Sequence, residues 1–145
     1  MIYLLYGQPA SGKTTLGKLL ANHFNTPFII DGDEFRKMFT NKNYGKDGRE
    51  ENIRNANAVA TYLNKKTAEE GHVIVSLVNP YESLRKELKN NNKNQVIEIL
   101  LLSDRDLRKE YHVEDFEVGD PDYMIKTDQE VDKSWEQLKS LLNEG

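Results

Sequence analysis

The sequence predicts an α/β fold, a three-layer α/β/α sandwich built on a five-stranded parallel sheet. Short apolar segments rich in β-branched and aromatic residues alternate along the chain with segments of helical periodicity. The first, third and fourth of the short segments are nearly all apolar, as expected for parallel strands that helices cover on both faces. The chain of 145 residues has the length of one domain, so we expect a single domain over residues 1–145.

The first half of the chain predicts two strands and three helices. The strands are the apolar segments Ile2–Tyr6 and Phe28–Ile30. A short helix runs through Phe35 and Phe39, and a longer one opens near Asp47, which is expected to cap it. Apolar side chains line one face of the first and third helices: Leu16, Leu19, Leu20 and Phe24, and Ile53, Ala56, Ala60 and Leu63.

The second half predicts three more strands and a closing helix. The strands are His72–Val78, Val96–Leu102 and the weaker Tyr123–Lys126, and the polar stretch Lys89–Asn94 is expected to be a solvated turn. Trp135 lies in the apolar stripe of the last helix, which favours a place in the core over contact with a ligand. The stripe consists of Val131, Trp135, Leu138 and Leu142.

The composition limits the possible function classes. A net charge of −4 argues against a protein that coats DNA or RNA, whereas a mononucleotide can bind in a locally basic cleft. The absence of Cys excludes a disulfide scaffold, a Cys-ligated metal and a thiol nucleophile. No stretch approaches the ~18 apolar residues of a membrane span, and residues 1–6 lack the features of a secretory signal. We therefore expect a cytoplasmic protein that does not bind membranes.

A glycine-rich loop directly after the first strand carries the strongest chemical signal. It fits the pattern GxxxxGK[ST] with Gly7, Gln8, Pro9, Ala10, Ser11, Gly12, Lys13 and Thr14. Backbone amides of such a loop, together with the positive end of the following helix, bind phosphate oxygens. We expect Lys13 to bridge the β and γ phosphates of ATP, Thr14 to bind Mg²⁺, and Thr15 to complete the ATP site. A fortuitous turn is the alternative, and the strand before and helix after disfavour it.

Two carboxylates follow the second strand, in the sequence Asp31-Gly32-Asp33. Open α/β sheets bind their ligands at the carboxyl ends of their strands, so these groups are expected to face the triphosphate. One can hold a metal-bound water while the other accepts a proton from a substrate hydroxyl. The alternative for Asp33 is that it caps the next helix, a role compatible with catalysis.

Two further clusters fall at the same edge of the predicted sheet. Arg49 and Asn52 share one face at the start of the long helix, an arrangement suited to an anion and a nucleotide edge. Asn79-Pro80-Tyr81 follows the third strand, with Arg85 four residues later. From spacing alone, solvated turns explain both clusters equally well.

In their order these motifs resemble the adenylylsulphate kinase family, a family with the P-loop nucleoside triphosphate hydrolase fold. Asp31-Gly32-Asp33 with Arg36 is similar to the family's DGDxxR motif. Arg49 with Glu51-Asn52-Ile53-Arg54 is similar to its DRxENIRR segment, and Val73–Ser76 leading to Pro80, Tyr81 and Arg85 is similar to its IVSxxSPYxxxR segment. The resemblance is dense from Met1 to Lys89.

The resemblance implies an enzyme that uses ATP and Mg²⁺ to phosphorylate the 3′-hydroxyl of adenosine 5′-phosphosulfate. By analogy, Asp33 is the base, Asp31 supports metal and water, and Tyr44 stacks on the substrate base. Arg36, Arg49 and Asn52 would bind the substrate's anionic chain and sugar, beside Asn79, Pro80 and Tyr81. Expected partners are a small nucleotide and, as an open option, a second copy of the chain in a homodimer.

Several residues depart from the family pattern at substrate positions. Gly48 replaces an acidic residue, Asn55 an Arg, Asn79 a Ser, and Glu82 an Arg. These departures keep open a second kinase, one that phosphorylates cytidine diphosphoramidate in capsule biosynthesis. A small-metabolite kinase and a non-catalytic ATP-binding module remain further alternatives.

The family's basic lid is much shortened, to about residues 104–122. We expect this segment to close over the bound substrates, because water would otherwise compete as the nucleophile. Arg105 and Arg108, with Lys109, could reach ATP, and Phe116 could provide the second face of a base sandwich. A plain amphipathic surface helix explains the same residues.

Overall fold

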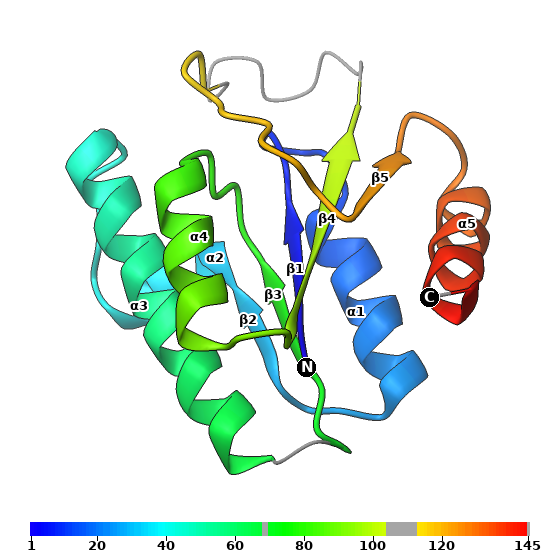
Figure 1. The fold of residues 1–145 in the computed structure, drawn as a ribbon. Helices are drawn as coiled ribbons and strands as arrows, with labels where there is room; N and C mark the ends of the chain where they lie inside the picture. The colour runs from blue at the N-terminus through cyan, green and yellow to red at the C-terminus, as the bar shows by residue number, and fades with distance from the viewer. Residues whose placement is uncertain (68–69, 104–112, 145) are drawn as a thin grey trace.

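The computed structural model of the protein describes residues 1–67, 70–103 and 113–144. Its elements are β1 (Ile2–Tyr6), α1 (Lys13–Phe24), β2 (Ile29–Asp31), α2 (Gly32–Met38), α3 (Lys46–Lys66), β3 (Val73–Ser76), α4 (Glu82–Asn91), β4 (Val96–Leu102), β5 (Tyr123–Lys126) and α5 (Val131–Glu144). The strands form one parallel sheet in the order β2-β3-β1-β4-β5, with their carboxyl ends upward in Figure 1. No helix within the described ranges is long and apolar enough to cross a membrane.

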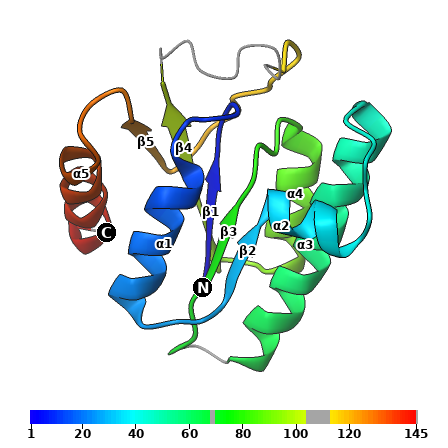
Figure 2. The ribbon, with the colours of Figure 1, turned by 180° about the vertical axis from the view of Figure 1, so that it is seen from behind.

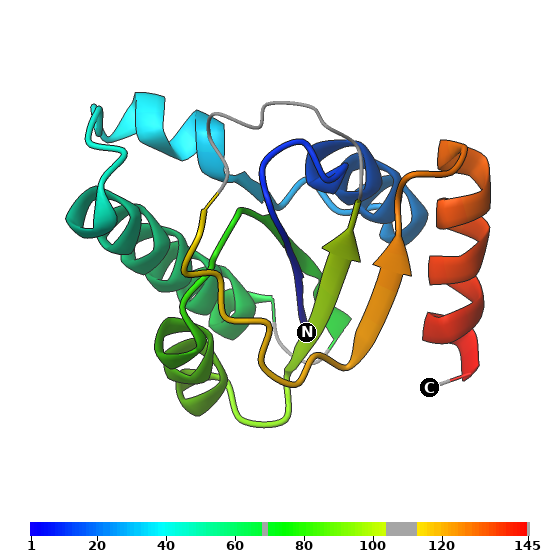
Figure 3. The same cartoon turned by 90° about the horizontal axis from the view of Figure 1, so that it is seen from above.

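Helices cover both faces of this sheet, which confirms the predicted three-layer sandwich (Figures 2 and 3). On one face, side chains of α2, α3 and α4 pack against alternate residues of β1, including Leu4. On the other, α1 and α5 pack against the intervening residues, including Leu5. Trp135 of α5 packs against this second cluster, as its place in the apolar stripe predicted. The central strand β1 is therefore buried on both sides, because both of its faces lie against helices.

One helix boundary and one whole helix differ from the sequence-based expectations. The long helix α3 begins at Lys46 with Gly45 as its N-cap, so Asp47 lies in its first turn and does not cap it. Helix α4 was not among the predicted helices. It ends at Asn91, so it includes the first half of the stretch Lys89–Asn94, which was expected to be a solvated turn. The reason is composition: α4 is mostly polar and buries only Leu84, Arg85 and Leu88. So short an apolar stripe gives a weak periodic signal.

A buried carboxylate lies on β4, beside the central strand of the sheet. Glu98 of β4 is 5% exposed, and Lys89 of α4 places its Nζ 3.5 Å from Oε2 of Glu98. Burial raises the pKa of Glu98, although the charges of Lys89 and Arg85 pull that pKa down, and the nearby Asp122 carboxylate raises it further. The folded protein therefore holds the Glu98 proton more tightly than the unfolded chain does.

A raised pKa gives a specific pH dependence of stability. The folded state gains stability from Glu98 at low pH and loses it as pH rises through the raised pKa. The Glu98→Gln variant should therefore become progressively more stable relative to the parent as the pH rises from about 4 towards neutral pH. Urea unfolding across this range measures the difference. The Glu87→Gln variant, changed at an exposed position, controls for the loss of one negative charge. If both variants showed the same pH dependence of stability, Glu98 would not be its source.

Candidate active site

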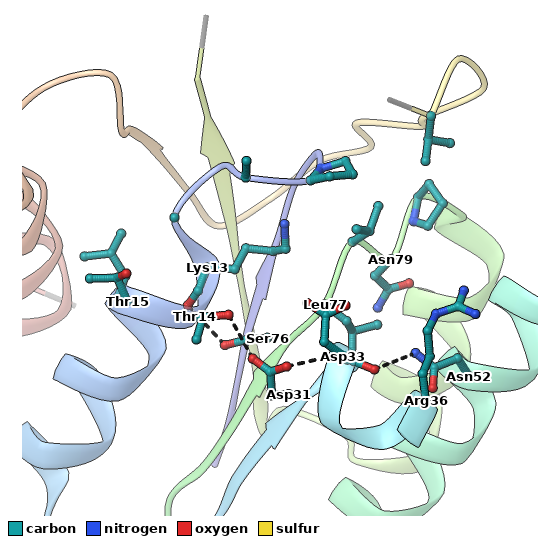
Figure 4. A pocket seen from close by; sticks show the side chains of 18 of the residues that line it. Lys13, Thr14, Thr15, Asp31, Asp33, Arg36, Asn52, Ser76, Leu77 and Asn79 are labelled. Carbon is teal, nitrogen blue, oxygen red and sulfur yellow. Dashed lines mark hydrogen bonds between the residues drawn. The ribbon is translucent and has the colours of Figure 1, made fainter. Parts of the chain in front are cut away.

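A cavity of about 530 Å³ lies at the carboxyl edge of the sheet (Figure 4). Its volume is within the range of small-molecule sites. Most of its polar lining comes from the start of α1, the end of β2, the first turns of α2 and α3, and residues at and after the end of β3. Among the residues predicted from the sequence, the cavity brings together Pro9, Ala10, Gly12, Lys13, Thr14, Thr15, Asp31, Asp33, Arg36, Tyr44, Arg49, Asn52, Asn79 and Pro80. The loop lysine and the second-strand carboxylates thus share one cavity.

The glycine-rich loop holds its lysine close to its own backbone. Lys13 Nζ donates to Gly7 O at 3.1 Å, to Gln8 O at 2.7 Å and to Ser11 Oγ at 3.2 Å. Gly12 is the N-cap of α1 with φ 93°, a left-handed conformation that favours glycine. A Cβ on Gly7 would lie 2.5 Å from Leu101 O, so this position requires glycine because β4 passes so closely. The loop therefore places the Lys13 cation beside the amino-terminal end of α1.

Gln8 and Ser11 support the loop and do not line the cavity. The Gln8 side chain bonds both backbone groups of Val113, donating from Nε2 at 2.8 Å and accepting at Oε1 at 2.9 Å. Thr127, which directly follows β5, donates its hydroxyl to Ser11 O at 2.6 Å and lines the cavity. Thr127 was not predicted, although its position at a strand's carboxyl end was a signal that could have found it.

Asp31 joins the second strand to the glycine-rich loop. Its Oδ1 accepts from the backbone amides of Asp33 at 3.0 Å and Glu34 at 3.3 Å, so Asp31 caps α2 and Asp33 does not. Its Oδ2 accepts from the Thr14 hydroxyl at 2.8 Å. A hydroxyl and a carboxylate oxygen in contact suit Mg²⁺, which keeps most of its waters and takes few protein ligands. No group of three His, Cys, Asp or Glu side chains that could hold a metal ion occurs within the described ranges.

Asp33 differs from Asp31 in having an available carboxylate. The side chain is exposed and lines the cavity in the first turn of α2. Over the part of the chain that the structure describes, its carboxylate accepts no hydrogen bond, whereas both oxygens of Asp31 are occupied. An unoccupied carboxylate at the cavity wall can accept a proton from a bound hydroxyl.

Two arginines and an aromatic loop form the wall beyond Asp33. Arg36 donates from Nη1 to Asn43 O at 2.8 Å, and its guanidinium carbon lies 4.2 Å from the centre of the Tyr44 ring. Arg49 donates from Nη1 to Tyr44 O at 2.9 Å and from Nε and Nη2 to the Tyr81 hydroxyl at 3.0 and 2.9 Å. Tyr81 is buried and does not line the cavity. It therefore orients Arg49 from behind the wall.

The loop that carries Tyr44 packs directly on Gly48 of α3. A Cβ on Gly48 would lie 1.8 Å from Asn43 O, and the Gly48 carbonyl accepts from Asn41 Nδ2 at 2.7 Å. The acidic residue expected here from the family pattern has no room unless the loop moves. The loop can therefore lie in this position only because residue 48 has no side chain.

Gly48→Ala should thus destabilise the protein by about 1–3 kcal/mol, the usual cost of overpacking. Because the same loop holds both arginines, the variant should also bind anionic nucleotides less tightly. Urea unfolding and calorimetry measure the two effects. Glu51→Ala, an exposed change in the same helix, is the control and should leave both quantities unchanged, while a neutral Gly48→Ala would show that the loop yields freely.

The expected lid residues divide into two groups. Arg105, Arg108 and Lys109 lie outside the described residues. Phe116 does not line the cavity: it packs against the core cluster of α3 and α4, with its ring parallel to that of Tyr6 at a centroid distance of 6.1 Å.

The opposite end of the cavity was not predicted. Val131 and Ser134, in the first turns of α5, line it near Thr127. Val131 was assigned to the apolar core stripe, and nothing in the spacing of these residues distinguishes a cavity wall from a helix face. The cavity thus extends from the arginine wall, past the glycine-rich loop, to α5.

Comparison with protein families gives a match that covers most of the chain. The family model described as adenylylsulphate kinase matches residues 1–116. Among curated proteins, cytidylate kinase from Methanococcoides burtonii is 47% identical over 38 residues, which are 26% of this chain and 22% of that protein. The chain thus spans under a quarter of the curated relative that it matches.

Solved structures share the fold over nearly the whole chain. The Mycobacterium tuberculosis APS kinase CysC in complex with AMPPNP and APS aligns with a TM-score of 0.79 and 19% identity, covering 98% of this chain and 96% of that one. The hexameric APS kinase from Thiobacillus denitrificans has a TM-score of 0.71 and 21% identity, over 99% of this chain and 28% of that one. A gluconokinase from Sinorhizobium meliloti has a TM-score of 0.68 and 16% identity, covering 98% of this chain and 91% of that one.

Proposed function

The chain belongs to the adenylylsulphate kinase family, and we propose that it transfers the γ-phosphoryl group of ATP to the 3′-hydroxyl of a 5′-modified nucleotide. Adenosine 5′-phosphosulfate is the first candidate for this second nucleotide. The observation that carries the proposal is that Lys13 and Asp33, from the first and second strand ends, line one cavity. A phosphate-binding cation and an available carboxylate are the two groups that this transfer needs.

The residues around the glycine-rich loop are proposed to bind ATP. Lys13 and the loop amides would neutralise the β and γ phosphates, and Thr127, Val131 and Ser134 would contact the nucleoside at the other end of the cavity. Thr14 and Asp31 would hold Mg²⁺, which offsets negative charge on the phosphates when bound. Arg105 and Arg108 are proposed, from the sequence alone, to add positive charge over ATP.

Asp33 is proposed to remove the proton of the 3′-hydroxyl. The hydroxyl oxygen attacks the γ-phosphorus, its bond to phosphorus forms as the bond to the β-γ bridging oxygen breaks, and ADP leaves. The proton passes to the Asp33 carboxylate and then to water. Both carboxylate oxygens of Asp31 already accept hydrogen bonds, from the Thr14 hydroxyl and from backbone amides of α2, so Asp31 is less suited to accept this proton.

The arginine wall is proposed to bind the second nucleotide. Arg36 and Arg49 suit the anionic 5′ chain, because guanidinium groups bind phosphate and sulfate oxygens through paired N–H groups. The exposed ring of Tyr44 offers a stacking surface for the base, with Asn52 at the sugar and Asn79 and Pro80 completing the wall. Tyr81 would act by orienting Arg49. Phe116 remains a proposed second face for the base, although it packs against the core in the structure.

Cytidine diphosphoramidate is the second candidate for this nucleotide. Two features favour keeping it: Gly48, on which the Tyr44 loop packs, and Asn79, which stands where the family has serine. Asn79 lines the wall proposed to bind the second nucleotide, Gly48 lies against the loop that carries Tyr44, and neither residue belongs to the glycine-rich loop. The donor ATP is therefore the same for both candidates.

The test is to supply ATP and Mg²⁺ with each second nucleotide and to measure ADP release together with the 3′-phosphorylated product by mass spectrometry. One nucleotide should consume ATP stoichiometrically, and its 3′-deoxy analogue should not. If no nucleotide conjugate stimulates turnover above hydrolysis by water, a non-catalytic ATP-binding module becomes the better description.

A further inference from the structure

We propose that Asn79 is a specificity-determining residue that recognises an amino group beside a hydrogen-bond acceptor on the second nucleotide. The inference rests on the proposed function, because it concerns the same wall of the cavity. It goes further by naming the chemical group that this wall selects.

The Asn79 carboxamide is buried and unpaired within the described part of the chain. The residue is 1% exposed and lines the cavity, as Figure 4 shows. Neither its Oδ1 nor its Nδ2 has a hydrogen-bond partner among the described residues. Buried carboxamides are normally satisfied, since leaving them unpaired costs the free energy of their lost hydration. A ligand in the cavity can supply both missing bonds.

A buried arginine fixes the position of Asn79. Arg85, 1% exposed, donates from Nη1 to Asn79 O at 2.7 Å and from Nη2 to Glu117 O at 2.5 Å. Its guanidinium carbon also lies 4.4 Å from the centre of the Tyr6 ring. With its backbone held in this way, Asn79 keeps its side chain at the cavity wall.

The backbone conformation offers an alternative reason for asparagine here. Asn79 has φ 45°, in the left-handed region that Asn and Gly adopt most readily. Glycine would meet this requirement without burying an unpaired carboxamide. The backbone alone therefore explains why Ser is absent but not why a side chain with two unpaired polar atoms is present.

A second amide narrows the chemistry of the ligand. Asn52 donates from Nδ2 to Gly32 O at 3.2 Å, which fixes the orientation of its amide because a carbonyl needs a donor. Its Oδ1 is buried and has no hydrogen-bond partner within the part of the chain that the structure describes. The wall thus presents two amide oxygens and one amide nitrogen beside Arg36 and Arg49. Amide oxygens need N–H or O–H groups on the ligand, which a sulfate ester does not provide.

We assign the sugar hydroxyls to Asn52 and an amino group with its neighbouring hydrogen-bond acceptor to Asn79. Two parts of a nucleotide have this pattern: an exocyclic amine beside a ring nitrogen, and a phosphoramidate nitrogen beside a phosphoryl oxygen. A carboxamide can pair with either through two parallel hydrogen bonds.

The experiment combines variants of Asn79 with changes in the nucleotide. Asn79→Gly keeps the left-handed backbone and removes the carboxamide, whereas Asn79→Asp keeps the shape and removes the donor. The nucleotides are cytidine diphosphoramidate, cytidine diphosphate, uridine diphosphoramidate, adenosine 5′-phosphosulfate and inosine 5′-phosphosulfate. Cytidine diphosphate lacks the terminal amino group, and the uridine and inosine compounds lack the base amine.

Asn79→Gly should lower kcat/KM for the preferred nucleotide by roughly 10–100-fold, with the KM for ATP unchanged. Removing the recognised amino group from the nucleotide should cost the parent a similar factor and the variant little, because the two changes delete one interaction. The arm that shows this coupling identifies which amino group Asn79 contacts. Additive losses in both arms, or unchanged kcat/KM in both variants, would overturn the proposal.

Asn57 provides a matched control. It lies in the same helix as Asn52, is buried with an unpartnered Oδ1, and donates from Nδ2 to Leu84 O at 3.1 Å, but it does not line the cavity. Asn57→Asp should lower the melting temperature and leave the order of preference among nucleotides unchanged. A change in that order would show that any buried amide alters selectivity, which would also overturn the proposal.

Binding measurements separate this inference from the proposed function. If the parent phosphorylates none of these nucleotides, the proposed function fails. Calorimetric titration of the same nucleotides into the ADP-loaded parent and variants then measures the same coupling without turnover. If the parent binds none of them, the inference fails as well.

Discussion

Asp33→Asn is expected to lower kcat for phosphoryl transfer by about 10²–10⁴-fold, the usual contribution of a general base. The KM for ATP should stay unchanged, because Asp33 lies in the first turn of α2 and ATP is assigned to the glycine-rich loop. Asn has nearly the same shape and leaves the cap of α2 intact, since Asp31 provides that cap. The loss should therefore reflect chemistry and not folding. Steady-state kinetics with saturating ATP measures it.

The neighbouring Glu34 makes a suitable control for this variant. Glu34 is also exposed in the first turn of α2 but does not line the cavity, so Glu34→Gln changes the net charge by the same amount and should retain full kcat. ADP binding, followed as an increase in melting temperature, should be equal in parent and both variants. A fully active Asp33→Asn enzyme would exclude Asp33 as the base and turn attention to Asp31.

The sheet and its two main site loops could be predicted because their signals are local. β1 is apolar at every position, and the glycine-rich loop follows it without a gap. The signal of the two carboxylates is also local, because Asp31 ends β2 and Asp33 follows it by two residues. Parallel strands bring all such loops to one edge, so strand assignment alone was enough to place Lys13 and Asp33 in one cavity.

The remaining parts of the site depend on contacts between distant segments. Tyr81 resembles a wall residue in sequence, yet its hydroxyl is bound by Arg49, 32 residues away, and it lies behind the wall. Gln8 is part of the phosphate-binding pattern, but its side chain bonds Val113. No local pattern encodes such pairings, because they form only after the strands have assembled.

Gly48 shows the same limit at a position that departs from the family pattern. The sequence shows that an acidic residue is missing, but not that the Asn43 carbonyl occupies the space where its Cβ would lie. The two unpaired amides, Asn52 and Asn79, are also invisible before the structure, since Asn is typical of surface turns. The specificity that we propose therefore depends on the features that sequence patterns describe least well.

Lys13→Met should lower kcat/KM for ATP by about 10²–10³-fold, the loss expected when one group that stabilises developing charge is removed. Met keeps the length of the side chain but lacks the cation that now contacts Gly7 O and Gln8 O. Lys18→Met, on the exposed face of the same helix, should remain fully active and controls for the loss of positive charge. Steady-state kinetics over a range of ATP concentrations measures kcat/KM, and thermal unfolding checks that each variant folds. If Lys13→Met retained parental kcat/KM, the triphosphate would have to bind away from the glycine-rich loop, and the proposed roles of Thr14 and Asp31 would fail with it.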